Sequence, residues 1–250
     1  MNILMLAPDF YPFLGGVGTY IFELSRHLPK DSNIHILTPE RVGQLKLENI
    51  IDSLGYSSKE NITMHYAGKC RESFLYNFSF QLNCRRLIAD LIKRHEIDIV
   101  HSQSAMPDLM INPAKLGVPV VTTVHTTIEG QVEAIKKTRT NFSDLYYSEK
   151  MTVLLGPILN SLENRYYRGL RHYILVSEWS KRQFSSKKCV DVTKLDRIYN
   201  GVDPTFFSPE KIRDAADYFP QLVDSEKPIV LYLSRIMPSK GIQILKAALQ

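Results

Sequence analysis

The sequence predicts an α/β fold in which helices cover both faces of a parallel β-sheet. Short apolar runs, rich in β-branched residues, recur along the chain, and stretches of helical periodicity separate them. This alternation is typical of parallel strands that are joined by helical crossovers. We expect strands at Ile3–Leu6, Ile34–Leu37, Ile62–His65, Ile97–His101, Val118–Val124, His172–Val176 and Leu195–Ile198.

Helices are expected between these strands. In Gly16–His27 and Phe78–His95 the apolar residues recur on one helical stripe. A shorter helix follows Pro107 and closes at Gly117, which suits a C-cap, and Ser177 suits the N-cap of another. The other segments have mixed patterns: residues 129–168 are helical in places, and residues 40–60 and 68–77 are expected to be irregular.

The character of the chain changes after Asn200–Asp203. Four prolines and many charges follow, which is typical of an interdomain linker. A fresh apolar run at Ile229–Leu233 and a helix start at Gly241 come next. We therefore predict a first domain over residues 1–203, a linker over 204–228, and the first strand and helix start of a second domain over 229–250.

A lone strand and half a helix cannot bury their own apolar faces. We expect residues 229–250 to be disordered, to dock on the first domain, or to pair with another copy of the chain through an exposed strand edge. Self-association is thus one expectation from the sequence.

Composition narrows the class of protein. The chain has 250 residues, 44% hydrophobic and 23% charged, which is normal for a globular protein, and its net charge of +5 favours anionic partners. No apolar run is long enough to span a membrane, and no basic segment precedes the first strand, so a signal peptide is not expected. The three cysteines are far apart, and local spacing shows no Cys/His cluster, so neither a zinc site nor a disulfide framework is expected. These features predict a cytoplasmic protein with reduced thiols.

Glycines follow the first strand at positions 15, 16 and 18. Between a strand end and a helix start, such residues let backbone N–H groups approach a phosphate. The dinucleotide fingerprint fits poorly, because Ile21 occupies its third glycine position and the loop is too long for its tight turn. A plain turn is the other interpretation.

The stretch Pro8–Gly18 resembles the opening loop of the retaining glycosyltransferases of GT-B fold, family 4, which are built from two Rossmann-like domains. Similar segments follow in the family's order and span nearly the whole chain. They are Asp98–Ser102, a strand ending in an exposed His; Val121–Thr127, a second strand-end His element; Val176–Ser180, a serine-led helix start; Ile198–Asp203 with Phe207–Pro209, an "NGVD…F.P" junction; and Leu231–Arg235 with Lys240–Gly241, the entrance to the second domain.

The resemblance implies transfer of a sugar from a nucleoside diphosphate donor to an acceptor hydroxyl, with retention of configuration. Positive side chains replace a metal ion in this family, so no metal or other cofactor is expected. By similarity, Arg235 and Lys240 stabilise the leaving diphosphate, and Gly15 and Gly16 donate backbone N–H groups near the phosphates or the acceptor. The alternative for the two cations is an exposed turn beside a strand.

His125 is the other catalytic candidate, because the carboxyl end of a parallel strand points into the ligand crevice of such sheets. The resemblance implies that it contacts the donor sugar or stabilises charge near the reacting centre; a structural hydrogen bond is the alternative. His101 is expected to line the same cleft. Asp9 and Tyr11 are acceptor-side candidates, although Asp9 could instead brace the glycine loop.

The acceptor is expected to be a carbohydrate or a lipid. The aromatic segment 74–80 lies beside Arg71, Arg85 and Arg86, and aromatic and cationic residues together suit contact with the inner face of a membrane. The alternative is a helix that packs its aromatic face on the sheet.

Two other function classes stay open at this point. One is a nucleotide-sugar epimerase of the same two-domain architecture, and the other is a non-catalytic nucleotide- or nucleic-acid-binding module. Nucleic acid is not expected as a partner, because no basic stripe with interleaved aromatics is found. The family's donor-binding pair of glutamates has no counterpart in these 250 residues, so we expect this chain to be inactive by itself.

Overall fold

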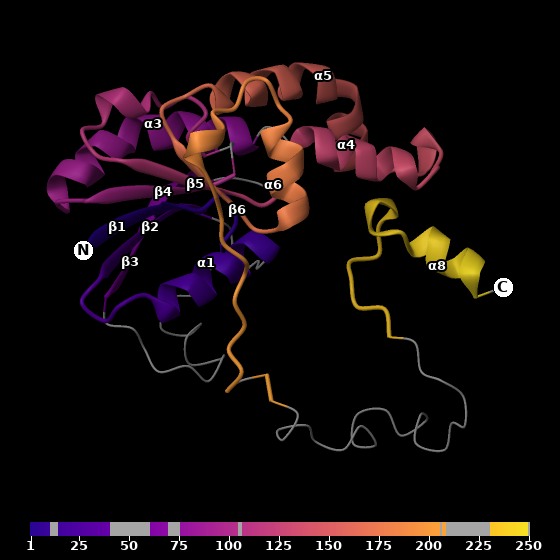
Figure 1. Cartoon of the computed structure of the whole chain (residues 1–250), viewed down its shortest axis with the longest axis horizontal. Coiled ribbons are helices and arrows are strands. Elements are labelled where there is room, and N and C mark those ends of the chain that lie inside the picture. Colours follow the sequence, from indigo (N-terminus) through magenta and orange to yellow (C-terminus); the bar gives the residue numbers. More distant parts are fainter. Residues whose placement is uncertain are drawn as a thin grey trace.

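The computed structural model describes residues 1–10, 15–40, 61–69, 76–104, 107–205, 207–208 and 231–249. Its centre is a seven-stranded sheet of order β3-β2-β1-β4-β5-β6-β7, in which all six neighbouring pairs are parallel (Figure 1). The strands are β1 Asn2–Leu6, β2 Asn33–Glu40, β3 Ile62–Lys69, β4 Ile99–Gln103, β5 Val120–Val124, β6 His172–Leu175 and β7 Leu195–Arg197.

Helices of several lengths connect and flank the strands. The α-helices are α1 Gly16–His27, α3 Tyr76–Arg94, α4 Ile128–Lys137, α5 Tyr147–Tyr167, α6 Glu178–Ser185 and α8 Ile242–Ala248. The short 3₁₀ helices are η1 Pro113–Lys115, η2 Phe142–Asp144, η3 Val192–Lys194 and η6 Pro238–Lys240. No described helix is long and apolar enough to cross a membrane.

Side chains alternate between two buried faces of the sheet. On one face Ile3, Met5 and Ile36 pack against α1. On the other face Leu4 and Leu37 pack against α3. Figure 1 shows α1 and α3 on opposite sides of the sheet. Because successive strand residues point to opposite faces, this alternation decides which polar side chains can meet.

A buried ion pair stabilises the part of the α3 face that α3 itself does not cover. Arg171 Nε donates to Asp108 Oδ2 at 2.8 Å, and the two side chains are 4% and 1% exposed. The hydroxyls of Ser102 and Tyr166 donate to Asp108 Oδ1 at 2.7 and 2.8 Å. Burial, and secondly the neighbouring Asp108 carboxylate, hold the pKa of Tyr166 well above its usual value, so this phenol stays a neutral donor. The network joins β4 and α5 to the residue that precedes β6.

Most predicted elements are confirmed. The seven expected strands all form. Strands β2 and β3 are longer than expected, β5, β6 and β7 are shorter, and β4 begins and ends two residues later than expected. Residues 129–168 hold most of α4 and all of α5, and Ser177 caps α6 by accepting from the N–H of Ser180 at 3.0 Å. The expected irregular segments were slightly too wide, because residue 40 lies in β2, residues 68–69 in β3 and residues 76–77 in α3. Residues 41–60, 70–75 and 209–230, and so most of the predicted linker, lie outside the described residues.

The prediction of a short α-helix between Pro107 and Gly117 is wrong. Residues 107–110 form a turn, and η1 is a 3₁₀ helix rather than an α-helix. Gly117 does follow the end of η1 with a φ of +73°, as a terminating glycine should. Pro113 restricts Asn112 to an extended conformation, with φ −90° and ψ 109°. In addition, the guanidinium of Arg171 donates to the carbonyl oxygens of residues 108 and 111 at 3.1 and 2.8 Å. A contact with a distant residue therefore occupies groups that an α-helix would use.

The predicted strand Ile229–Leu233 does not form in its described part. Leu231 and Leu233 are 81% and 90% exposed and lie in no strand, because no neighbouring strand in the described part of the chain pairs with them. The helix expected at Gly241 does form, as α8. Self-association through this segment stays a prediction, as does the division into domains.

Residues 231–249 dock beside α4 and α5 (Figure 1). The N–H of Ser239 donates to Glu149 Oε1 at 3.0 Å, and the hydroxyl of Tyr146 donates to the carbonyl oxygen of Ile236 at 3.0 Å. Docking on the first domain was one of the arrangements expected from the sequence.

The buried ion pair gives a test of this packing. Arg171→Ala leaves the Asp108 carboxylate buried without its cation, and we expect the free energy of unfolding to fall by about 3–5 kcal/mol. Lys137→Ala is the control, because Lys137 pairs with Glu133 on the surface, where the side chains are 72% and 51% exposed, and its loss should cost at most about 0.5 kcal/mol. Urea unfolding measures both. Equal losses in the two variants would contradict the buried network.

Candidate active site

Five side chains meet where β4 and β5 end beside α1: Tyr20, His101, Gln103, Thr123 and His125. We call them the His125 cluster. His101 Nε2 lies 2.8 Å from Thr123 Oγ1, and His125 Nε2 lies 3.0 Å from Gln103 Oε1. Since an amide oxygen only accepts, the latter contact makes Nε2 of His125 the donor and leaves its Nδ1 as an acceptor.

Both histidines of the cluster are neutral near pH 7. Burial lowers the pKa of His125 to about 4. Burial, and secondly the neighbouring His125, lower the pKa of His101 to about 4. Burial also raises the pKa of Tyr20, so this phenol keeps its proton. The cluster can therefore hydrogen-bond a ligand, but it brings no positive charge to a phosphate.

Tyr20 connects the cluster to the glycine loop. Its ring meets the His125 ring edge-on, with the centroids 4.8 Å apart, and its hydroxyl lies 3.4 Å from Thr123 Oγ1. Tyr20 belongs to α1, one turn beyond Gly16. The sequence placed Tyr20 only on the helix stripe and did not single out Gln103 or Thr123. Parallel strand ends meet at one edge of a sheet, and this was the signal that could have found the last two.

Asp9 braces the glycine loop, as the alternative interpretation held. The N–H of Gly15 donates to Asp9 Oδ2 at 3.0 Å, so it is occupied in this structure. A Cβ at position 15 would lie 2.3 Å from that oxygen, and only glycine allows so close an approach. Gly16 faces open space instead, with no atom within 4 Å of a Cβ built there. Tyr11 lies outside the described residues.

Two cavities flank the cluster. One of about 450 Å³ lies between α1 and residues 198–203, and Gly16 and Tyr20 line it. The other, of about 130 Å³, lies between the ends of β5 and β6, and His125, Thr126 and Trp179 line it. Of the cluster, Tyr20 lines the first cavity and His125 lines the second, whereas His101, which was expected to line the cleft, is buried and lines neither.

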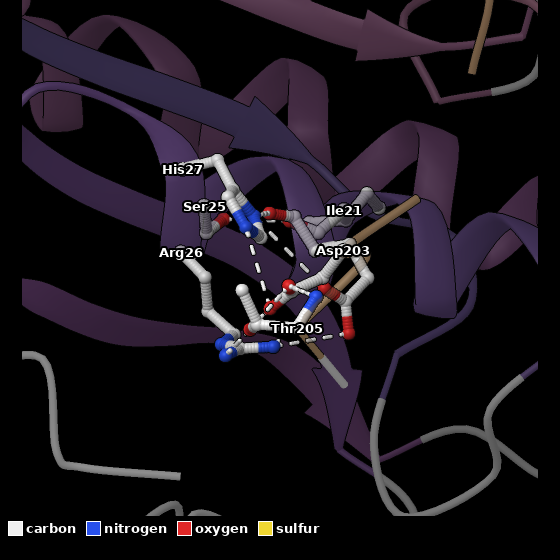
Figure 2. A network of polar contacts seen from close by, with 7 residues as sticks. Ile21, Ser25, Arg26, His27, Asp203 and Thr205 are labelled. Atoms are coloured by element: carbon white, nitrogen blue, oxygen red, sulfur yellow. Dashed lines mark hydrogen bonds and ion pairs between the residues drawn. The ribbon is translucent and has the colours of Figure 1, made fainter. Parts of the chain in front are cut away.

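The Asn200–Asp203 segment is attached to the end of α1 (Figure 2). Asp203 Oδ2 lies 3.9 Å from both Arg26 NH2 and His27 Nε2. The N–H of Thr205 donates to Asp203 Oδ1 at 2.8 Å. Basic residues near the carboxyl end of a helix interact favourably with the helix dipole, and here they also hold a carboxylate from the junction between the segments.

Arg235 and Lys240 are not part of this group in the structure. Both are exposed, both lie on the segment that docks beside α4 and α5, and they line neither of the two cavities. The structure thus brings Gly16, His101 and His125 near one another through Tyr20 and Thr123. The role of Arg235 and Lys240 on phosphate stays a prediction.

A third cavity, of about 810 Å³, lies between α3 and α5. Its lining is mainly apolar and includes Phe78, Leu159 and Leu162. In the predicted aromatic segment, Phe80 is buried against the sheet, whereas Phe78 is 57% exposed at this cavity. Phe80 therefore packs as the helix interpretation predicts, and Phe78 is the exposed aromatic residue among the described side chains of the segment.

The expectation that the chain has no Cys/His cluster is wrong, because three histidines that are far apart in sequence lie close together in the structure. His35, His65 and His95 bring their ring nitrogens within 4.8 Å of one another. Successive members are 30 residues apart in sequence, a spacing that matches no local metal-binding motif.

The pKa of His101 makes stability depend on pH. The unfolded chain protonates this imidazole below about pH 6.5, whereas the folded chain does so only below about pH 4. The unfolded state therefore binds more protons between these values, and the free energy of unfolding decreases as the pH falls. Between about pH 7 and about pH 5 we expect His101→Gln to remove about 2 kcal/mol of that decrease. Urea unfolding at both pH values measures it. His172→Gln, at an exposed position, should keep the full decrease; an unchanged slope in His101→Gln would contradict the buried neutral state.

Comparison with known proteins identifies the family. The family model described as Glycosyltransferase Family 4 matches residues 14–206. The chain is 23% identical over 258 residues to the uncharacterised glycosyltransferase MJ1178 of Methanocaldococcus jannaschii, covering 100% of this chain and 57% of that protein. It is 24% identical over 251 residues to a component of the human phosphatidylinositol N-acetylglucosaminyltransferase, covering 98% of this chain and 43% of that protein. The chain thus spans about half the length of the curated relatives it matches.

Solved structures show the same fold. A glycosyltransferase from Rickettsia africae superposes with a TM-score of 0.61 at 23% identity, over 99% of this chain and 56% of that one. Other structures of this fold, with TM-scores from 0.51 to 0.54, were solved with UDP or a UDP-sugar bound. The matched region includes Gly16, the whole His125 cluster and the Asp203 junction. The chain therefore belongs to Glycosyltransferase Family 4 and carries the N-terminal domain of its GT-B fold.

Proposed function

We propose that this chain supplies the acceptor-side lobe of an enzyme that transfers a hexosyl-type sugar from a nucleoside diphosphate donor to a hydroxyl group, with retention. The observation that carries the proposal is the His125 cluster, a buried and neutral polar group between two cavities at the strand ends. The carboxyl ends of parallel strands are where such sheets bind ligands. The match to a glycosyltransferase family model favours this class over an epimerase or a nucleotide-binding module.

His125 has a specific role in this proposal. Its Nε2–H donates to Gln103, so its Nδ1 is available to accept from a sugar hydroxyl. Because its pKa is lowered to about 4, His125 orients the sugar and does not neutralise the diphosphate. The side chain amide nitrogen of Gln103 is buried and has no partner among the described residues, and such atoms are rarely left unpaired in complete sites.

The negative charge of the leaving diphosphate has to be stabilised by groups outside the His125 cluster. Bond cleavage places negative charge on it, and preorganised cations are the groups that stabilise such charge. Arg235 and Lys240 are the cations implied by the family, but in this structure they lie on the segment docked beside α4 and α5. We propose that the chain of 250 residues by itself does not turn over a sugar donor, because its neutral cluster and its cations are apart.

We further propose a lipid acceptor and a peripheral contact with the cytoplasmic face of a membrane. Residues 151–162 of α5 contain no ionisable side chain, and Leu154, Ile158 and Leu162 on one stripe are 61%, 62% and 43% exposed. Arg165 and Arg168 follow at the end of this helix, and apolar residues next to cations suit an anionic bilayer. The name of the human relative includes phosphatidylinositol, which supports an acceptor of this kind.

The catalytic proposal is tested in two steps. The chain of 250 residues, incubated with UDP- or GDP-sugars and lipid or sugar acceptors, should form no product. In an active form of the enzyme, His125→Ala should lower kcat/KM by about 100-fold, because a preorganised hydrogen bond to the reacting sugar is lost. His172→Ala, at an exposed position, is the matched control and should leave kcat/KM unchanged. Equal activity of the two variants would contradict the role of His125, and product from the chain alone would contradict its inactivity.

The membrane proposal has its own test. Ile158→Glu places a charge in the exposed apolar stripe of α5 and should reduce co-sedimentation with anionic phosphatidylserine vesicles by at least about 10-fold, since a charged residue resists burial in a bilayer interface. Val192→Glu is the control, because Val192 is 57% exposed on η3. If the unchanged chain does not sediment with these vesicles at low salt, the proposal fails.

A further inference from the structure

Three histidines gather on the α3 face of the sheet, on strands that the His125 cluster does not use. His35 lies on β2, His65 lies on β3, and His95 directly follows the last residue of α3. The ring nitrogens that could bind a metal all lie within 4.8 Å of one another. None of the three residues belongs to the proposed glycosyltransferase site.

The fold explains why these residues meet. Leu37 packs against α3, so His35, two residues earlier on β2, points to the same face. His65 pairs with Leu37 in the parallel register and therefore also points to this face. Helix α3 covers that face, and its end brings His95 onto the two strands. Sheet alternation and one helix end thus converge on a single place.

The geometry is close to that of a metal site. His35 Nδ1 lies 3.0 Å from His65 Nε2. The ring centroid of His95 lies 4.5 Å from that of His35 and 4.9 Å from that of His65. Nitrogen ligands on tetrahedral Zn²⁺ lie about 3.3 Å apart, as follows from Zn–N distances of about 2.0–2.1 Å. The nitrogens of His35 and His65 already lie near that separation, and all three ligand atoms lie within 4.8 Å of one another.

One cationic side chain lies beside the three histidines. Arg94, the last residue of α3, is paired with Asp90, with Arg94 NH2 and Asp90 Oδ2 2.6 Å apart. This ion pair offsets part of the positive charge that Arg94 places next to the cluster.

We propose that His35, His65 and His95 bind one divalent transition-metal ion, for which Zn²⁺ is the best match. Three imidazoles suit Zn²⁺, Co²⁺ and Ni²⁺, and a water molecule completes a tetrahedral set. The ion would tie the outermost strand β3 and the end of α3 to β2. The three histidines lie outside the proposed glycosyltransferase site, so this ion is separate from the expectation that sugar transfer needs no metal, and the proposal holds whether or not the proposed function is correct.

Metal titration of the chain tests the proposal. The chain is prepared without a polyhistidine tag, treated with a chelator and dialysed, and then titrated with Zn²⁺ by calorimetry and with Co²⁺ by visible absorption. We expect one ion per chain, intense Co²⁺ d–d bands typical of tetrahedral coordination, and a Tm that rises with the Zn²⁺ concentration. No binding by either metal at micromolar protein would overturn the proposal.

Variants locate the site. His35→Asn and His95→Gln each remove one ligand, and each should weaken Zn²⁺ binding by more than about 100-fold, the upper end of what changes in outer-shell partners cost. His95 is only partly buried, so the His95→Gln variant still tests the site if the variant of the buried His35 folds poorly. Circular dichroism verifies the fold of each variant. His172→Gln, on the surface at β6, is the matched control and should bind Zn²⁺ as the unchanged chain does. Undiminished binding in both ligand variants would assign the metal elsewhere, for example to a cysteine, and would also overturn the proposal.

Discussion

The alternation of side chains between two covered faces of one parallel sheet is the constraint that organises this molecule. On β1 and β2 successive residues are buried on alternate faces, one covered by α1 and the other by α3. On β4, His101 turns to the α1 face, and its neighbour Ser102 turns to the opposite face. The two adjacent polar residues therefore serve different networks, a neutral cluster at the proposed site and a buried ion pair on the other side.

The two networks differ because their charges differ. The Asp108–Arg171 pair is fully desolvated, so it is tolerable only with the hydroxyls and carbonyls that satisfy both partners. The His125 cluster avoids that cost because its imidazoles are neutral. A neutral, hydrogen-bonded pocket suits sugar hydroxyls, and it leaves the compensation of phosphate charge to residues outside this cluster.

The sequence predicted the sheet well because its signals are local. Runs of β-branched residues located the strands, and the position of His125 after β5 located the candidate site. What the sequence did not predict depends on contacts between distant residues. Arg171 donates to carbonyl groups of the segment after Pro107 that the expected helix would have used. The partners of His125 come from β4 and from α1. The grouping of His35 with two histidines far along the chain could not be predicted for the same reason, since the register of β2 and β3 and the end of α3 bring them together.

The attachment of Asp203 to α1 has a structural consequence. Helix α1 is 12 residues and so about 18 Å long. Near one end Arg26 and His27 contact Asp203 (Figure 2), and Gly16 and Tyr20 lie in the first two turns. The same short helix therefore carries both the contact with the Asn200–Asp203 segment and the ring that packs edge-on against His125.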